Sequence, residues 1–331
     1  MTLATDFGPP MSISRRCFTT GLTLSLCAAA LPKAIAQQKP IKLAVGASPG
    51  GTTDLVARGL AQQLSQQLTQ PTLVENKPGA AGNIAMQYVA NALPDGKTLL
   101  VSYTSFSINA SLYTKLPFDP IKDFTPISML AIVPSVLAVR SDFPANDMAE
   151  LIALIKAKPG YYSAGLGGLG SSLHMATEML KMMAKLDFIN VPYQGSVPSV
   201  TALLGGQISM MFASTQNIAA HVKAGSIKVL GVTSLQPIKM FVGVAPIADT
   251  VKDFESYSWY GLFGPANLPA SLISSYNDVV QQAVTLPEFK KLFELDGGQA
   301  KSSSPQEFAA FVQSDIEKYA AVVRATGATA N

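Results

Sequence analysis

The 331-residue sequence is poor in cysteine, histidine and arginine. Its two cysteines, Cys17 and Cys27, both precede Ala36, so a mature chain that begins beyond Ala36 holds no disulfide and no thiol. This excludes cysteine nucleophiles and cysteine-based metal sites from such a chain. The two histidines, His174 and His221, fit none of the usual zinc-ligand spacings, so we expect no metal site.

Charge is also scarce. Only 14% of the residues are charged and 48% are hydrophobic, which is enough for two domains with packed cores and far from the composition of a disordered chain. Loss of Arg15, Arg16, Lys33 and Asp6 with the N-terminal segment would lower the formal net charge from +3 to +1. We therefore expect no basic surface for nucleic acid.

Residues 1–36 have the pattern of a secretory signal peptide. Arg15–Arg16 precede an apolar run at 21–31, and Ala34–Ala36 have the small-x-small order of a cleavage site. The run is shorter than the roughly 20 residues that span a bilayer, which disfavours a membrane anchor. A lipoprotein box at Cys27 is disfavoured by the bulky residue before it. We predict cleavage near Ala36 and a periplasmic location, with Sec or twin-arginine export left open.

The remaining chain alternates predicted strands and helices. An apolar strand at 42–45 is followed by a glycine loop at 48–53 and by an apolar stripe at helical spacing from Val56 to Leu68. Further strands are expected at 72–74, 98–103, 127–132, 135–140, 161–164, 188–191, 207–212, 227–232 and 257–264. Further helices are expected at 83–92, 147–157, 171–184, 197–204, 269–285, 287–294 and 305–325, and one more helix is expected to end at residue 224. This alternation predicts an α/β fold with mostly parallel sheets.

Two such blocks without a flexible linker predict two lobes joined by crossing strands. We expect the crossings near 128–140 and 227–232. The first lobe would then comprise residues 37–130 and 233–331, and the second lobe residues 131–232.

The stretch GLGGLGSSLH at 165–174 contains G-x-G-x-x-G, a pattern that dinucleotide-binding enzymes use. A true fingerprint follows the first strand and is followed about 20 residues later by a ribose-binding acid. Here the loop lies in mid-chain, and Asp187 precedes the next strand instead of ending it. A hydrolase built on Ser171 and His174 would lack the G-x-S-x-G elbow. Both enzyme hypotheses are disfavoured, and we expect no enzymatic activity and no cofactor.

Two loops, at 50–53 and 167–172, place small residues immediately before a predicted helix. Backbone N–H groups at the start of a helix carry about half a positive charge and can hold an anion. Glycine, serine and threonine are also ordinary helix caps, so one loop alone would indicate little. One loop in each lobe favours a cleft for an anion. The arginines beyond residue 36 are too dispersed to form a clamp, so we expect a weak acid held by N–H groups, hydroxyls and water.

Several motifs resemble those of the Bug-type receptors, the solute-binding proteins of tripartite tricarboxylate transporters. They are ASPGGTTD at 47–54, VENKPGAAGN at 74–83, PDG at 94–96, LPFDP at 116–120, KDFTPI at 122–127, VPYQGS at 191–196, LGGQ at 204–207 and WYGLF at 259–263. The resemblance spans the chain beyond residue 36. It implies a two-lobed periplasmic-binding-protein fold, type II-like, that closes around a carboxylate ligand, with membrane permease subunits as partners.

Carried over by motif, the resemblance implies ligand-binding groups in both lobes. They are Ser48, Gly50, Gly51, Thr52, Thr53, Asp54, Ala80, Asn83 and Ser105 in the first lobe, and Gly167, Ser171, Ser172, His174, Tyr193, Ser196, Ala213 and Ser214 in the second. We expect a monomer that carries a di- or tricarboxylate or an aromatic carboxylate to the permease. A receptor that serves signalling is the alternative.

Three departures from the family pattern bear on the ligand. Gly46-Ala47 stands where many relatives have Pro-Phe, Ala213 where an acid is common, and Gln194 where a basic residue is common. The first change is expected to widen the pocket and the second to remove a polar partner. We therefore favour a larger, less polar acid, with aromatic acids among the candidates.

Overall fold

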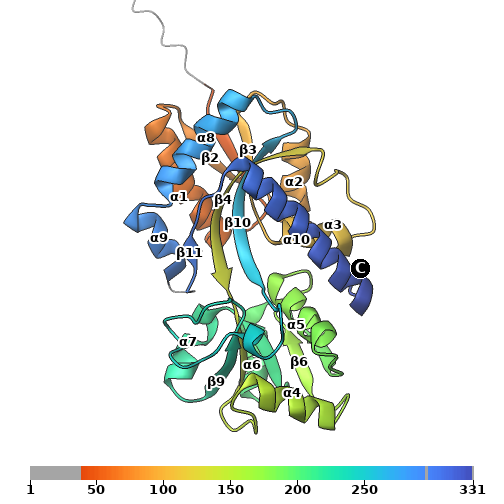
Figure 1. The fold of residues 1–331 in the computed structure, drawn as a ribbon. Coiled ribbons are helices and arrows are strands. Elements are labelled where there is room, and N and C mark those ends of the chain that lie inside the picture. Colours follow the sequence, from red (N-terminus) through yellow and green to blue (C-terminus); the bar gives the residue numbers. More distant parts are fainter. Residues whose placement is uncertain (1–38, 295–296, 330–331) are drawn as a thin grey trace, which may run out of the picture. The chain divides into compact units, whose positions relative to one another are not determined.

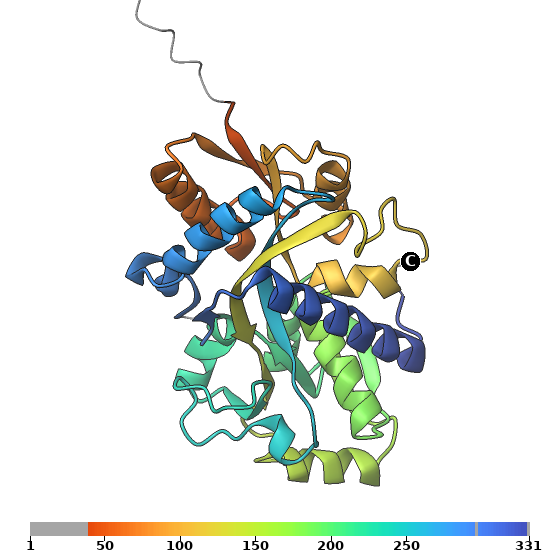
Figure 2. The same ribbon diagram turned by 45° about the horizontal axis from the view of Figure 1, so that its top comes forward.

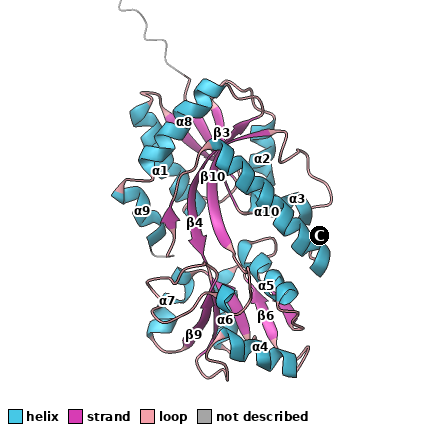
Figure 3. Cartoon of the chain, viewed as in Figure 1, coloured by secondary structure: helices cyan, strands magenta, loops and turns pink. Residues whose placement is uncertain are grey.

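The computed structural model of the protein describes residues 39–294 and 297–329, so the predicted signal peptide lies outside the described residues. The chain from Lys39 onward forms one compact unit that contains two mixed sheets (Figures 1 and 3). The predicted two-lobed α/β fold is confirmed.

The sheet of the first lobe has six strands in the order β11-β4-β10-β3-β1-β2. The strands are β1 (Ile41–Val45), β2 (Thr72–Asn76), β3 (Thr98–Tyr103), β4 (Phe124–Pro134), β10 (Tyr257–Pro265) and β11 (Gln299–Ala300). Its helices are α1 (Thr52–Gln67), α2 (Asn83–Ala90), α3 (Ser105–Leu112), α8 (Ala270–Ala283), α9 (Pro287–Glu294) and α10 (Pro305–Thr326).

The sheet of the second lobe has five strands in the order β7-β6-β8-β5-β9. The strands are β5 (Val136–Arg140), β6 (Ser163–Leu166), β7 (Ile189–Pro192), β8 (Met210–Ala213) and β9 (Ile227–Val232). Its helices are α4 (Met148–Ala157), α5 (Ser172–Met183), α6 (Ser196–Leu204) and α7 (Thr215–Lys223).

Parallel pairing is limited to part of each sheet. Strands β1, β2 and β3 are parallel to one another, as are β6, β7 and β8, whereas β4, β5, β9, β10 and β11 pair antiparallel. Strand β4 leads out of the first sheet and β10 leads back into it, so the two run in opposite directions where they pair. The expectation of mostly parallel sheets therefore describes the βα repeats but not the strands that join the lobes.

The two crossings between the lobes are joined to each other. Strand β4 runs into β5 through Ser135, and the return path runs from Thr233 to Ser256 after β9. The backbone N–H of Ser135 donates to Thr233 Oγ1 at 2.8 Å, and the N–H of Thr233 donates to the Ser135 carbonyl at 2.9 Å. The sequence places the second crossing within β9, but β9 belongs to the second sheet because it pairs with β5.

Helix α10 packs on both lobes. Figure 2 shows α10 alongside α5 of the second lobe. Phe308, near the start of α10, lies in an aromatic cluster with Phe106, Trp259 and Phe263, while Tyr319, near its end, lies in a core cluster with residues of α5. Gly261 is needed beneath this helix, since a Cβ there would lie 2.1 Å from the Phe308 ring. Among the described residues, no helix is long and apolar enough to cross a membrane.

Candidate ligand-binding site

Three loops of the first lobe meet at one edge of its sheet. They follow β1, β2 and β3, and the carboxyl ends of adjacent parallel strands lie at the same edge. The backbones of the first two loops touch, because a Cβ on Gly46 would lie 2.5 Å from the Gly82 Cα. Gly46 therefore opens no space of its own, and the predicted widening of the pocket depends on Ala47.

Asp54 fixes the shape of the first loop. Its buried carboxylate accepts hydrogen bonds from the Gly50 N–H at 2.9 Å, from Arg58 Nε at 2.9 Å and from Asn76 Nδ2 at 2.8 Å. Burial raises the pKa of this carboxyl, but Arg58, the Gly50 N–H and Asn76 outweigh burial and lower the pKa to about 2. Asp54 is therefore ionised, and its contacts hold the loop and the start of α1.

The start of α1 is open. Ser48, Gly50 and Gly51 are exposed, Thr52 is half-buried and Thr53 is buried. Gly51 is the N-cap and has no side chain with which to bind the first N–H groups of the helix. A ligand oxygen can therefore take the place that a serine or threonine cap would occupy.

The second loop has an unusual backbone. Ala80 and Ala81 both have positive φ angles, 47° and 51°, a conformation that costs energy for residues other than glycine. Asn109 of α3 supports this turn, because its buried Nδ2 donates to the Ala81 carbonyl at 3.1 Å and to Asn83 Oδ1 at 2.8 Å. Asn83 is thus turned toward the protein interior, while Ala80 is exposed.

Ser105 begins α3 and lies beside the second loop. Its side chain is only 3% exposed, and its Oγ makes no hydrogen bond of good geometry with any described residue. A Cβ on Gly82 of the second loop would lie 3.7 Å from this oxygen and 3.6 Å from the Tyr103 hydroxyl. The Ser105 and Tyr103 hydroxyls interact with each other, so Ser105 has a polar neighbour within the protein.

The second lobe repeats this arrangement. The loops that follow the parallel strands β6, β7 and β8 meet at one edge of the sheet. A Cβ on Gly167 would lie 3.2 Å from Ser196 Oγ, and one on Gly165 would lie 3.6 Å from the Tyr193 ring. The structure thus brings Gly167, Tyr193 and Ser196 together. Ser214, the N-cap of α7, is half-buried, whereas Ala213 is fully buried in the core and offers no side chain to a ligand.

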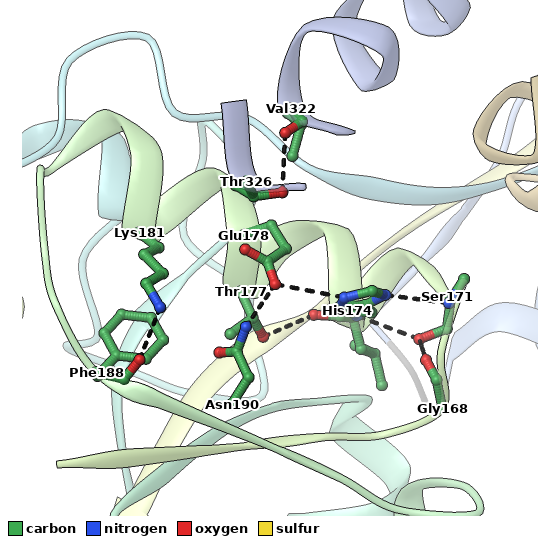
Figure 4. Close-up of polar contacts among 12 residues, drawn as sticks. Gly168, Ser171, His174, Thr177, Glu178, Lys181, Phe188, Asn190, Val322 and Thr326 are labelled. Atoms are coloured by element: carbon green, nitrogen blue, oxygen red, sulfur yellow. Dashed lines mark hydrogen bonds and ion pairs between the residues drawn. The ribbon is translucent and has the colours of Figure 1, made fainter. Parts of the chain in front are cut away.

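The remaining candidates of the second lobe are occupied by contacts within the protein (Figure 4). Ser171 caps α5, accepting from the His174 N–H at 3.2 Å and donating to the Gly168 carbonyl at 2.7 Å. The His174 ring is 3% exposed, and its Nδ1 accepts from the Gly170 N–H at 3.1 Å. Its Nε2 lies 3.4 Å from Glu178 Oε1.

Strand β10 connects the two sets of loops. Ser258 Oγ lies 2.6 Å from Ser172 Oγ at the start of α5, and the Trp259 N–H donates to Thr104 Oγ1 at the start of α3 at 2.8 Å. Sequence reasoning missed Thr104, Asn109 and Ser258, although Ser258 directly precedes the WYGLF motif. Across residues 39–294 and 297–329, no cluster of side chains could hold a metal ion.

Two α/β lobes, joined by paired crossings and each carrying a set of loops at the carboxyl ends of its parallel strands, have the architecture of a solute-binding protein. Residues 56–328 match the family model of the tripartite tricarboxylate transporter family receptor, TctC, and the chain belongs to this family. The family consists of binding receptors, so the protein is not an enzyme.

Relatives match over nearly the whole chain. A UPF0065 protein of Bordetella pertussis is 32% identical over 320 residues, which cover 96% of this chain and 98% of that protein. The solved structure of Rpa4515 from R. palustris with adipate is 30% identical, covers 88% of this chain and 98% of its own, and has a TM-score of 0.74. MatC from Rhodopseudomonas palustris with bound malate is 28% identical, with coverages of 86% and 98% and a TM-score of 0.70.

Proposed function

We propose that the protein is a periplasmic receptor that captures a small carboxylate-bearing molecule and delivers it to the permease of a tripartite transporter. The observation that carries this proposal is the first loop set, in which helix α1 begins at Gly51 without a side-chain cap, together with a second loop set at the carboxyl edge of the other lobe's sheet. Backbone N–H groups there can bind a carboxylate without a cationic side chain. The proposed export signal has its cleavage site near Ala36, which N-terminal sequencing of the periplasmic protein would test.

The ligand would act by favouring the closed arrangement of the lobes. A molecule that contacts both loop sets binds more tightly when they are close together, and only this difference in binding free energy shifts the population. The permease would then recognise the closed form. We expect the receptor to work as a monomer, because each chain contains both loop sets.

The ligand class is proposed as dicarboxylates first and aromatic carboxylates second. Adipate and malate are the molecules bound by two similar proteins. The case for an aromatic acid depends on Ala47 and Gln194, since position 46 is filled by backbone and the Ala213 methyl is buried. Gln194 is exposed at the edge of the second loop set and brings no charge to it.

A thermal-shift screen of the protein beginning at residue 37 tests this proposal. Adipate, malate, citrate and benzoate are compared with aspartate and with NADH. A ligand present at about 100 times its Kd stabilises the native state by about 2.7 kcal/mol, whereas NADH is expected to have no effect. Stabilisation by NADH and by none of the acids would overturn the receptor assignment. Strong binding of aspartate without any binding of benzoate would exclude aromatic carboxylates as ligands.

A further inference from the structure

His174 lies in a buried chain of polar contacts that ends at a proposed ligand loop. Asn190 Nδ2, from β7, donates to Glu178 Oε1 at 2.5 Å, and the same oxygen lies 3.4 Å from His174 Nε2. On the other side of the ring, Nδ1 accepts from the Gly170 N–H at 3.1 Å (Figure 4). The chain therefore runs from β7 through α5 to the loop at 167–170.

These contacts define the protonation state of the ring. Nδ1 must be unprotonated to accept from the Gly170 N–H, and the proton of the neutral ring then lies on Nε2, facing Glu178. The position is suited to glycine, because its φ is +74° and a Cβ there would lie 2.9 Å from the Leu112 side chain. Protonation of Nδ1 would place two N–H groups opposite each other and break the contact that holds the loop.

The other groups around the ring offer no second charge. Helix α5 packs against β6, β8 and α10, and neither β6 nor β8 contains an ionisable residue. Helix α10 faces α5 through Tyr319 and Val322, while its Asp315 and Lys318 pair with each other at 2.7 Å and Arg324 is exposed. Lys181 of α5 itself donates to the Phe188 carbonyl at 2.8 Å. Glu178 is thus the one charged group among the described residues that we find at the ring.

We infer that His174 is a positioning residue for ligand binding, which as the neutral Nε2–H tautomer holds the loop at 167–170 and releases it when protonated. The inference rests on the proposed receptor function and on Gly167 of this loop, which lies beside Ser196 in the second loop set. Ligand affinity then falls when Nδ1 takes up a proton, because the Gly170 N–H loses its acceptor. The buried ring itself does not touch the ligand.

Two isosteres separate this role from a merely structural one. His174→Asn places an amide oxygen close to the position of Nδ1 and cannot titrate, whereas His174→Gln reaches the position of Nε2 and leaves the Gly170 N–H without its acceptor. Adipate affinity is measured by calorimetry from about pH 8 to about pH 5.5, at a temperature where all variants are folded. We expect the wild type to lose affinity at low pH, His174→Asn to show a flat profile, and His174→Gln to bind about 2- to 10-fold more weakly at the upper end of this range.

Equal affinity of wild type and His174→Gln, or the same pH profile in wild type and His174→Asn, would overturn the inference. A second measurement needs no ligand: the ring-nitrogen NMR shifts of His174 should show the Nε2–H tautomer at mildly alkaline pH, and an Nδ1–H tautomer would also overturn it. If adipate, malate, citrate and benzoate all fail to bind the wild type, the proposed receptor function is wrong. The NMR shifts of the His174 ring nitrogens then test on their own whether the Nε2–H tautomer holds the loop.

Discussion

Ser172 and Ser258 share a hydrogen bond of 2.6 Å between their hydroxyl oxygens, which joins the start of α5 in the second lobe to β10 of the first. We expect Ser258→Ala to remove this contact and to weaken ligand binding by about 2- to 10-fold, because a typical hydrogen bond contributes about 0.5–1.5 kcal/mol. Calorimetry with the acid that gives the largest thermal shift measures the effect. Ser314→Ala, on the exposed side of α10, is the control, and equal affinities of the two variants would contradict the prediction.

Gly51→Leu should abolish binding and leave the fold intact. The Gly51 backbone is extended, with φ of −77°, and a Cβ there meets only the Ser48 carbonyl at 3.6 Å, so a side chain is tolerated. The leucine would cover the first N–H groups of α1. Affinity and thermal unfolding are compared with those of Gln62→Leu, an exposed change farther along α1. Unchanged affinity would remove the first loop from the site.

Asp54→Asn should destabilise the protein by up to about 2 kcal/mol at neutral pH, since the pKa of Asp54 is lowered from 3.8 to about 2. Solvent around the half-exposed Arg58 screens its attraction to Asp54 and so reduces the expected loss of stability. A lowered pKa stabilises the native state above pH 3.8, and this stabilisation is lost as the pH falls toward 2. Denaturant unfolding of wild type and variant should therefore differ most at neutral pH, with the difference shrinking below pH 3.8 and disappearing as the pH approaches about 2. A constant difference at every pH would show that Asp54 stabilises without its charge.

Ala81→Gly should be neutral or stabilise the protein by up to about 1 kcal/mol, because it relieves a left-handed backbone that alanine adopts at a cost. Ala320→Gly, in the interior of α10, should instead destabilise by about 0.5–1 kcal/mol. The two free energies of unfolding are measured under the same conditions. Destabilisation by both changes to the same extent would show that Ala81 is not strained.

The strand and helix order could be predicted because most elements carry a clear pattern of apolar residues. Helix α3 was not predicted, since it buries serine and asparagine along with phenylalanine and isoleucine and therefore shows no apolar stripe. The contact of Asn109 with the turn at Ala81 could not be predicted, because the two residues are 28 positions apart and meet only in the folded chain.

The orientation of His174 could have been anticipated in part. Glu178 follows it by four residues, a spacing that places the two side chains on one face of a helix. Whether that face is buried depends on α10, which lies far later in the sequence. The burial of Ala213 likewise depends on how the helices cover β8, which sequence patterns do not specify.

The hydrogen bonds between Ser135 and Thr233 have a consequence for the ancestry and engineering of the protein. They bring together the two ends of the stretch that contains β5 to β9, so that this stretch is a single insertion with adjacent entry and exit. Recombination at Ser135 and Thr233 would replace the whole second lobe, and with it one half of the proposed binding site, while the first lobe keeps its own sequence. Receptors with new ligand preferences can therefore arise from two breakpoints rather than from many separate substitutions.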